Sequence, residues 1–139
     1  MMRLPDHLFV AIEEEDYDIA QELIDKGTDV NAITLNGKTP LLWISEDDYE
    51  GENLDMMEFL IENGADVNAK TKDGLTPLHY AVGNACKGEY LLDLVEFLVK
   101  KGADVNARNN QGETPLSKAT IPEIKYFLEI ESQKTSSYN

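Results

Sequence analysis

Few side chains in this 139-residue chain could take part in catalysis. The chain contains one cysteine, Cys86, and two histidines, His7 and His79. A cysteine nucleophile needs a neighbouring base or another group that stabilises its thiolate, and the sequence places no base beside Cys86. Phosphate-binding loops, GxGxxG turns, HExxH pairs and CxxC pairs are absent from the sequence. We therefore predict a protein that is not an enzyme, with no catalytic residue and no cofactor.

Acidic side chains are numerous enough to raise the question of a metal site. The run from Glu46 to Glu52 reads EDDYEGE and offers the carboxylate oxygens that calcium prefers. A calcium loop of the common type alternates its ligands over twelve residues and ends in glutamate, and this run does not. The sequence therefore predicts weak, non-specific cation binding and no defined metal site.

The distribution of charge divides the chain into two halves. Residues 1–69 hold 18 acidic and three basic side chains, whereas residues 70–139 hold nine of each, so the net charge of −15 belongs to the first half. Such a surface repels nucleic acids and anionic membranes and attracts basic proteins. We expect a protein partner with a basic surface. The alternative, a negative surface that only maintains solubility, stays open.

The sequence favours a cytoplasmic protein that is a monomer when free. Its start, MMRLPDHLFVAIEEE, lacks the basic and apolar regions of a secretory signal, and no stretch approaches the roughly 20 apolar residues of a membrane span. A single cysteine excludes an internal disulfide. The length suits one domain whose core is large enough to fold without metals or disulfides.

Two short motifs alternate along the chain. GxTPL occurs three times, beginning at Gly37, Gly74 and Gly112. G(A/T)DVNA also occurs three times, at residues 27–32, 64–69 and 102–107. Because the two motifs alternate without exception, one copy of each marks a complete structural unit.

Local physical chemistry predicts the shape of each unit. Threonine before proline is a good helix start, because threonine caps the helix and proline suits its first position. The glycine of GADVNA follows an apolar helical pattern, where a left-handed residue ends a helix well. Between the motifs, Asp73-Gly74 predicts a tight turn. Each unit is therefore predicted to hold two helices followed by a finger resembling a β-hairpin.

These motifs resemble the ankyrin repeat, whose signature includes TPLHxA and whose period is about 33 residues. His79 completes TPLH, whereas Leu42 and Ser117 stand at that place in neighbouring units. The resemblance implies an all-α ankyrin-repeat solenoid of helix-turn-helix units. It also implies that His79 hydrogen-bonds the backbone between repeats, and that partners bind a concave face made by fingers and first helices.

Four units are expected within a single domain at residues 1–131, spanning about 3–33, 34–70, 71–108 and 109–131. The first and last units are expected to be capping repeats, with Asp6 capping the first helix and Pro122 opening the last. Residues 132–139 are predicted to be a flexible tail. The two internal units exceed the family period by about four or five residues, and their glycines place the excess in loops at 45–53 and 82–90.

The concave face is the first candidate surface. Trp43 and Tyr80 occupy the same place in successive first helices, where Val10 and Lys118 stand in the end units. An exposed tryptophan there would be a strong contact residue, and packing between first helices is the competing explanation. The finger positions predicted to face a partner are Leu35, Asn36, Lys38, Lys72, Asp73, Leu75, Asn110, Gln111 and Glu113.

An acidic rim is the second candidate surface. Stacking would bring residues 13–18 beside residues 46–50, with tyrosines among the carboxylates. Tyrosine supplies contact area and carboxylates steer a basic partner; alternatively, Tyr17 packs under its loop and the acids are merely solvated. The residues predicted for the rim and its adjoining loops are Glu14, Tyr17, Glu46, Asp47, Asp48, Tyr49, Asn84 and Tyr90.

These observations favour a non-enzymatic module that binds a basic protein. Small size and acidity suggest an inhibitor, or an antidote of the immunity-protein type that neutralises a basic toxin or nuclease. The alternative is a structural or adaptor protein whose partner is not selected by charge. A repeat scaffold alone does not decide between them.

Overall fold

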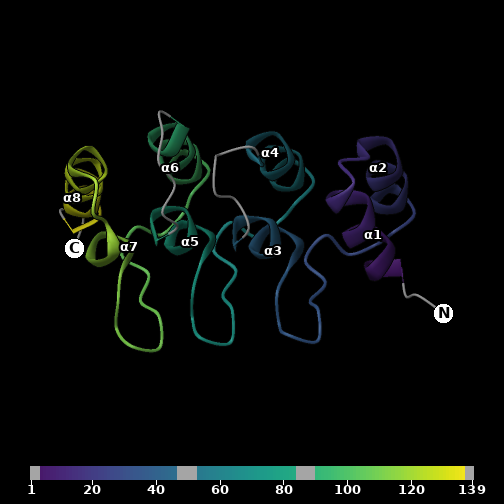
Figure 1. Ribbon diagram of the computed structural model, residues 1–139, viewed down its shortest axis with the longest axis horizontal. Helices are drawn as coiled ribbons and strands as arrows, with labels where there is room; N and C mark the ends of the chain where they lie inside the picture. The colour runs from purple at the N-terminus through teal and green to yellow at the C-terminus, as the bar shows by residue number, and fades with distance from the viewer. Residues whose placement is uncertain (1–3, 47–52, 84–89, 137–139) are drawn as a thin grey trace.

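The computed structural model describes residues 4–46, 53–83 and 90–136 of the chain. These residues form four stacked helix pairs, so the all-α solenoid predicted from the repeats is confirmed (Figure 1). One row holds the first helix of each pair and a second row lies over it (Figure 1). The first row comprises α1 (Leu4–Glu13), α3 (Pro40–Glu46), α5 (Pro77–Gly83) and α7 (Pro115–Lys118). The second row comprises α2 (Tyr17–Asp25), α4 (Leu54–Glu62), α6 (Tyr90–Lys100) and α8 (Pro122–Ser136).

Threonine caps begin three of the first-row helices, as predicted. The hydroxyls of Thr39, Thr76 and Thr114 accept hydrogen bonds of 3.2, 3.3 and 3.2 Å from the N–H three residues later. The predicted cap of the first helix is wrong, because α1 begins at Leu4 and therefore already contains Asp6 in its first turn. A carboxylate there still interacts favourably with the helix dipole.

Glycine ends three of the second-row helices, also as predicted. Gly27, Gly64 and Gly102 have φ of +102°, +98° and +102°, a conformation that other residues adopt only with strain. After α2, the N–H of Thr28 donates to the carbonyl of Leu23 at 3.0 Å, the bond that defines a Schellman stop. The same stop closes α4 and α6.

Helix α8 lacks this stop and therefore continues. Leu128 of α8 is buried and corresponds to Leu98 of α6. Ser132 therefore takes the position in α8 that Gly102 takes after α6. Serine does not favour the left-handed conformation, and α8 runs on to Ser136, past the expected end of the last unit at residue 131. The loops predicted at residues 45–53 and 82–90 are wrong at their edges, because α3 includes Ser45 and Glu46, α5 includes Val82 and Gly83, and α6 begins at Tyr90. The remaining parts, residues 47–52 and 84–89, lie outside the described residues.

Each finger is a tight hairpin-like turn that projects from the helical rows (Figure 1). In the first finger, the Thr34 N–H donates to the Lys38 carbonyl at 3.0 Å and the Gly37 N–H donates to the Thr34 carbonyl at 2.9 Å. Gly37 has φ of +78°, which is why glycine occupies this position. The other two fingers repeat both bonds, and no strand is assigned among the described residues.

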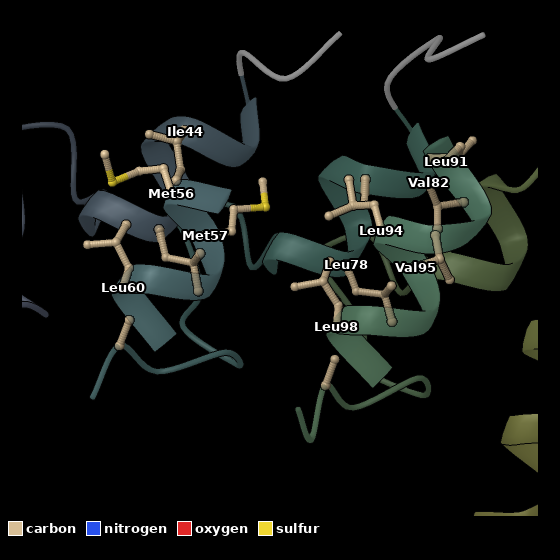
Figure 2. Close-up of a cluster of buried hydrophobic side chains, with 14 of the residues drawn as sticks. Ile44, Met56, Met57, Leu60, Leu78, Val82, Leu91, Leu94, Val95 and Leu98 are labelled. Carbon is tan, nitrogen blue, oxygen red and sulfur yellow. The ribbon is translucent and has the colours of Figure 1, made fainter. Parts of the chain in front are cut away.

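Leucine, isoleucine, valine and methionine side chains form a continuous core between the two rows. Figure 2 shows the part of this core that lies in the second and third units. The second unit contributes Ile44, Met56, Met57 and Leu60, and the third contributes Leu78, Val82, Leu91, Leu94, Val95 and Leu98. Because one helix pair cannot enclose such a core, each unit depends on its neighbours for stability.

Asparagine side chains tie neighbouring units together through the backbone. Asn31 donates to the Gly64 carbonyl at 3.0 Å and accepts from the Asp66 N–H at 2.8 Å. Asn68 makes the same pair of bonds to the next unit, at 3.0 and 2.7 Å. The asparagine of the first two G(A/T)DVNA motifs is therefore a bridge between units.

His79 forms a second bridge, and its hydrogen bonds determine its tautomer. Its Nδ1 accepts from the Thr76 N–H at 3.1 Å, so Nε2 carries the proton and donates to the Glu113 carbonyl at 2.9 Å. Burial lowers the pKa of His79 below its usual 6.5, and the charges of Lys118 and Lys70 act in the same direction. The imidazole is therefore held neutral, in the structural role that the resemblance implied.

We predict that Asn68→Ala lowers the free energy of unfolding by about 1–3 kcal/mol, because it leaves a backbone donor and acceptor without their partner. Asn106→Ala is the matched control, since Asn106 occupies the same motif position and its side chain has no partner among the described residues. It should change stability by less than about 0.5 kcal/mol. Urea denaturation of both variants measures the difference, and equal losses would contradict the bridging role.

We also predict that His79 makes stability depend on pH. Because its folded pKa lies below 6.5, the unfolded chain binds more protons in this window, and the contribution is complete above about pH 6.5 and lost as pH falls below it. His79→Leu introduces the residue that the second unit carries at this place and removes the titration. The stability difference between wild type and variant should shrink between about pH 7 and pH 5. If chemical denaturation shows that the unfolding free energies of wild type and variant change equally with pH, this prediction is refuted.

Candidate protein-interaction surface

Two kinds of site were sought among the described residues, a cluster of metal-ligand side chains and a membrane-spanning helix. They contain no group of three or more histidine, cysteine, aspartate or glutamate side chains placed to hold a metal ion. No helix among them has both the length and the apolar character needed to cross a membrane. His7 is exposed, His79 is a buried bridge, and Cys86 lies outside the described residues. The surface formed by the fingers and the first helices is the candidate site that the resemblance implies.

A hollow of about 450 Å³ on this surface lies between α1, the first finger and α3. Its base is aromatic, because Trp43 packs edge-on against Phe9 with ring centroids 4.9 Å apart. Trp43 is only partly buried, so it both packs between units and remains accessible. The residues that line the hollow are Asp6, Phe9, Thr34, Asn36, Lys38, Trp43 and Glu46.

Acidic charge dominates this hollow. Lys38 is its one basic residue, and its ammonium pairs with the carboxylate of Glu46. The negative field extends to the next first helix, where burial and then the charge of Glu46 raise the pKa of Tyr80 against the opposing effect of Lys38. Trp43 and Glu46 therefore line the same hollow, and the charge of Glu46 also acts on Tyr80 of the neighbouring first helix. We call the surface formed by the fingers and the first helices, which holds this hollow, the groove.

A second hollow, of about 290 Å³, lies between the second and third fingers. Its one basic residue, Lys118, lies 3.7 Å from a carboxylate oxygen of Glu113. A hydrogen bond from Asn109 and the charge of Lys118 hold the pKa of Glu113 below its usual value, against the effect of desolvation. The lining residues are Asp73, Leu75, Asn109, Asn110, Gln111, Glu113 and Lys118.

The finger tips are exposed and tied to one another. Leu35 is 91% exposed, and the Lys72 ammonium donates to its carbonyl at 3.2 Å. The Asn110 amide donates to the Lys72 carbonyl at 2.8 Å, and the Asn110 N–H donates to the Asp73 carbonyl at 2.9 Å. The predicted tip residues Asn36, Asp73 and Gln111 are exposed as well. The three fingers therefore present one ordered edge.

In the described part of the predicted acidic rim, Glu14 lines a hollow within the first unit, whereas Tyr17 contacts the second unit. Glu14 is exposed, whereas Tyr17 is not in a loop but begins α2, where it is 38% exposed. Its ring packs edge-on against Phe59 of the next unit at 5.4 Å, and burial, followed by Asp55 and Glu15, raises its pKa. Tyr17 is thus partly a packing residue.

The rest of the rim remains a prediction. Asp47, Asp48, Tyr49 and Asn84 lie outside the described residues, and Tyr90 is described only as the first residue of α6. Among the described residues, Glu13 and Glu15 line a hollow of about 140 Å³ together with Trp43, Ile44 and Asn53 of the second unit. Tyr17 packs against Phe59 of the same unit.

Sequence reasoning missed Phe9, Asp6 and Thr34, which line the first hollow. Counting along the first helices places Phe9 in register with Leu42 and His79, which are fully buried. That register indicates a buried position. It could not show that the ring also touches Trp43, because this contact depends on how far apart the units stack.

Comparisons with known proteins agree with this architecture. The model of a family described as ankyrin repeats, in three copies, matches residues 8–109. Among solved structures, the chain is similar to the ankyrin repeat domain of Bcl-3, described as a unique member of the IkappaB protein family, with 33% identity and a TM-score of 0.75. The match covers 88% of this chain and 50% of that one, so the chain spans about half the length of this relative. No curated protein sequence matches it.

We predict that Trp43→Ala lowers the free energy of unfolding by about 2 kcal/mol, less than a fully buried aromatic ring would cost. The loss has a structural cause, because the variant removes the contact with Phe9. Leu35→Ala is the control and should change stability by less than about 0.5 kcal/mol, because its side chain is exposed. Thermal and urea unfolding measure both, and an unchanged Trp43→Ala variant would show that the ring does not support the junction.

Proposed function

This chain belongs to the ankyrin repeat family, and we propose that it is a non-enzymatic protein-binding module for a partner with a basic surface. Its concave groove and acidic rim are the proposed contact surfaces. Ankyrin-type solenoids present such extended concave surfaces to their partners.

The groove itself supplies the observation that carries this proposal. Each of its two hollows contains one lysine, and each lysine is paired with a carboxylate of the same hollow. Asp6 and Asp73 add negative charge beside the pairs, and Trp43 supplies an accessible aromatic surface. Aromatic anchors provide binding energy, while a negative field steers and orients a basic partner.

The sharper form of the proposal is an inhibitor or immunity-type antidote that covers the basic surface of a toxin or nuclease. The concentration of all net charge in residues 1–69 supports this form. We propose a cytoplasmic protein that is a monomer when free and binds neither nucleic acid nor membrane. The second candidate is an adaptor whose partner is not selected by charge, and the finger edge, which mixes Leu35 with polar residues, suits that function equally well.

Charge reversal tests the proposal. The double variant Asp47→Lys, Asp48→Lys should weaken binding about tenfold or more and flatten its salt dependence, because it reverses the steering charge of the rim. Asp93→Lys with Glu96→Lys is the matched control, since both residues are exposed on α6, in the row of helices away from the fingers (Figure 1). Partners are captured from cell extract at low and high salt and then titrated against each purified variant.

Each outcome of this experiment has a defined meaning. A basic partner, lost at high salt and weakened only by the variant at residues 47 and 48, supports the proposal. Binding that is unchanged in that variant removes the rim from the contact surface. A reproducible partner without a basic surface favours the adaptor.

A further inference from the structure

A hollow of about 140 Å³ lies at the junction of the first two units, beside the ends of α1 and α3. Ile12 and Ile44 give it a buried apolar surface, and the partly buried ring of Trp43 gives it an accessible aromatic one. Glu13 and Glu15 are exposed and add two carboxylates. We call it the glutamate hollow, and its lining residues are Ile12, Glu13, Glu15, Trp43, Ile44 and Asn53.

The two glutamates of this hollow have no counter-ion in the described part of the first two units. Lys26 and Lys38 are the only lysine or arginine residues between positions 4 and 69. Each of these lysines is already paired with a different glutamate. Glu13 and Glu15 form no ion pair or hydrogen bond through their carboxylates with another described residue. The hollow therefore combines an aromatic ring with two negative charges that are not neutralised.

The backbone makes these two carboxylates unfavourable where they stand. The C-terminal end of a helix is the negative end of its dipole, and α1 has no basic residue in its last turn. Glu15 follows α1 with φ of +56°, the left-handed conformation that Gly27 adopts at the equivalent stop after α2. Glycine is the less strained residue in this conformation. A cation bound in the hollow would interact favourably with both carboxylates and with the end of α1.

The size and the chemistry of the hollow select a guanidinium group as this cation. A cavity of about 150 Å³ accommodates a benzene ring, so a hollow of about 140 Å³ has room for one planar guanidinium. A guanidinium stacks on tryptophan and donates paired hydrogen bonds to carboxylates. The ammonium of lysine is more strongly hydrated and has no planar face to stack.

Other sources of positive charge fit the hollow less well. Calcium takes six to eight oxygen ligands, whereas the isoleucines and the indole of this lining supply none. Residues 47–52, which join the two helices of the second unit, contain no lysine or arginine in the sequence. The neighbouring hollow of about 450 Å³ already contains the ammonium of Lys38.

We propose that the glutamate hollow binds an arginine side chain of the partner protein, with the guanidinium on the ring of Trp43 and its N–H groups directed to Glu13 and Glu15. This inference rests on the proposed function, because it names the group by which a partner with a basic surface is recognised. It also gives Trp43 a contact with the partner that is distinct from its packing against Phe9.

Fluorescence provides a direct test, because Trp43 is the only tryptophan of the chain. A peptide of six arginines is titrated into the protein and compared with a peptide of six lysines at the same ionic strength. We expect the arginine peptide to change the emission of Trp43 to saturation and to bind about threefold or more tightly than the lysine peptide, because only a guanidinium stacks on the ring.

A matched pair of variants separates the hollow from the general acidic field. Glu13→Gln with Glu15→Gly should weaken binding of the arginine peptide about fivefold or more, because it removes both carboxylates. This variant should unfold at a urea concentration no lower than the natural chain does, since glycine suits the positive φ. Glu14→Gln with Asp18→Asn removes the same charge from exposed residues that do not line the hollow, and should weaken binding less than about twofold.

Three results overturn the proposal. They are an emission of Trp43 that does not respond to the arginine peptide, equal binding of the two peptides, and equal losses in the two double variants. Equal losses in the variants would show attraction to the acidic surface as a whole.

The partner captured from cell extract separates this inference from the proposed function. A basic partner whose binding is unchanged by Glu13→Gln with Glu15→Gly overturns the role of the hollow and leaves the proposed function standing. A partner without a basic surface, found together with selective binding of the arginine peptide, overturns the proposed function and supports the hollow as a guanidinium site.

Discussion

Contact between neighbouring units is the interaction on which the rest of this molecule depends. A helix pair of this length cannot enclose a core, and its apolar side chains become buried only when the next pair covers them. The same contact aligns the fingers, through the bonds from Lys72 and Asn110, and creates the hollow between α1 and α3. The proposed binding surface is therefore a product of stacking, and Trp43 both packs against Phe9 and lines this surface.

Stacking also explains why the groove is suited to binding. Backbone hydrogen bonds hold each finger in its turn, and hydrogen bonds from side chains join one finger to the next. The surface is therefore ordered before a partner binds. Preorganisation of this kind reduces the entropy lost on association. Because Lys38 and Lys118 are paired with carboxylates, the two hollows remain acidic. The neutral His79 joins α5 to the third finger without adding charge.

The sequence predicts local structure well because local structure has local causes. Threonine caps, left-handed glycines and finger turns follow from one or two residues each, and all appear where expected. Contacts across units depend on distances that no motif encodes, which is why the pairing of Tyr17 with Phe59 and of Trp43 with Phe9 could not be predicted. The last unit was expected to end at residue 131, but α8 continues to Ser136. Ser132 does not stop a helix, and a sequence without a stop signal does not define where the helix ends.

The asparagine bridges give the solenoid a direction. Asn31 and Asn68 each reach forward to the carbonyl and N–H of the following unit, and both use the same atoms over the same geometry. The second and third units therefore receive the preceding unit in the same way, and the deletion or duplication of one of them would leave matching ends. A chain built in this way can lengthen or shorten its groove during evolution without inventing a new joint, while changes within a unit remain free to alter what the groove recognises.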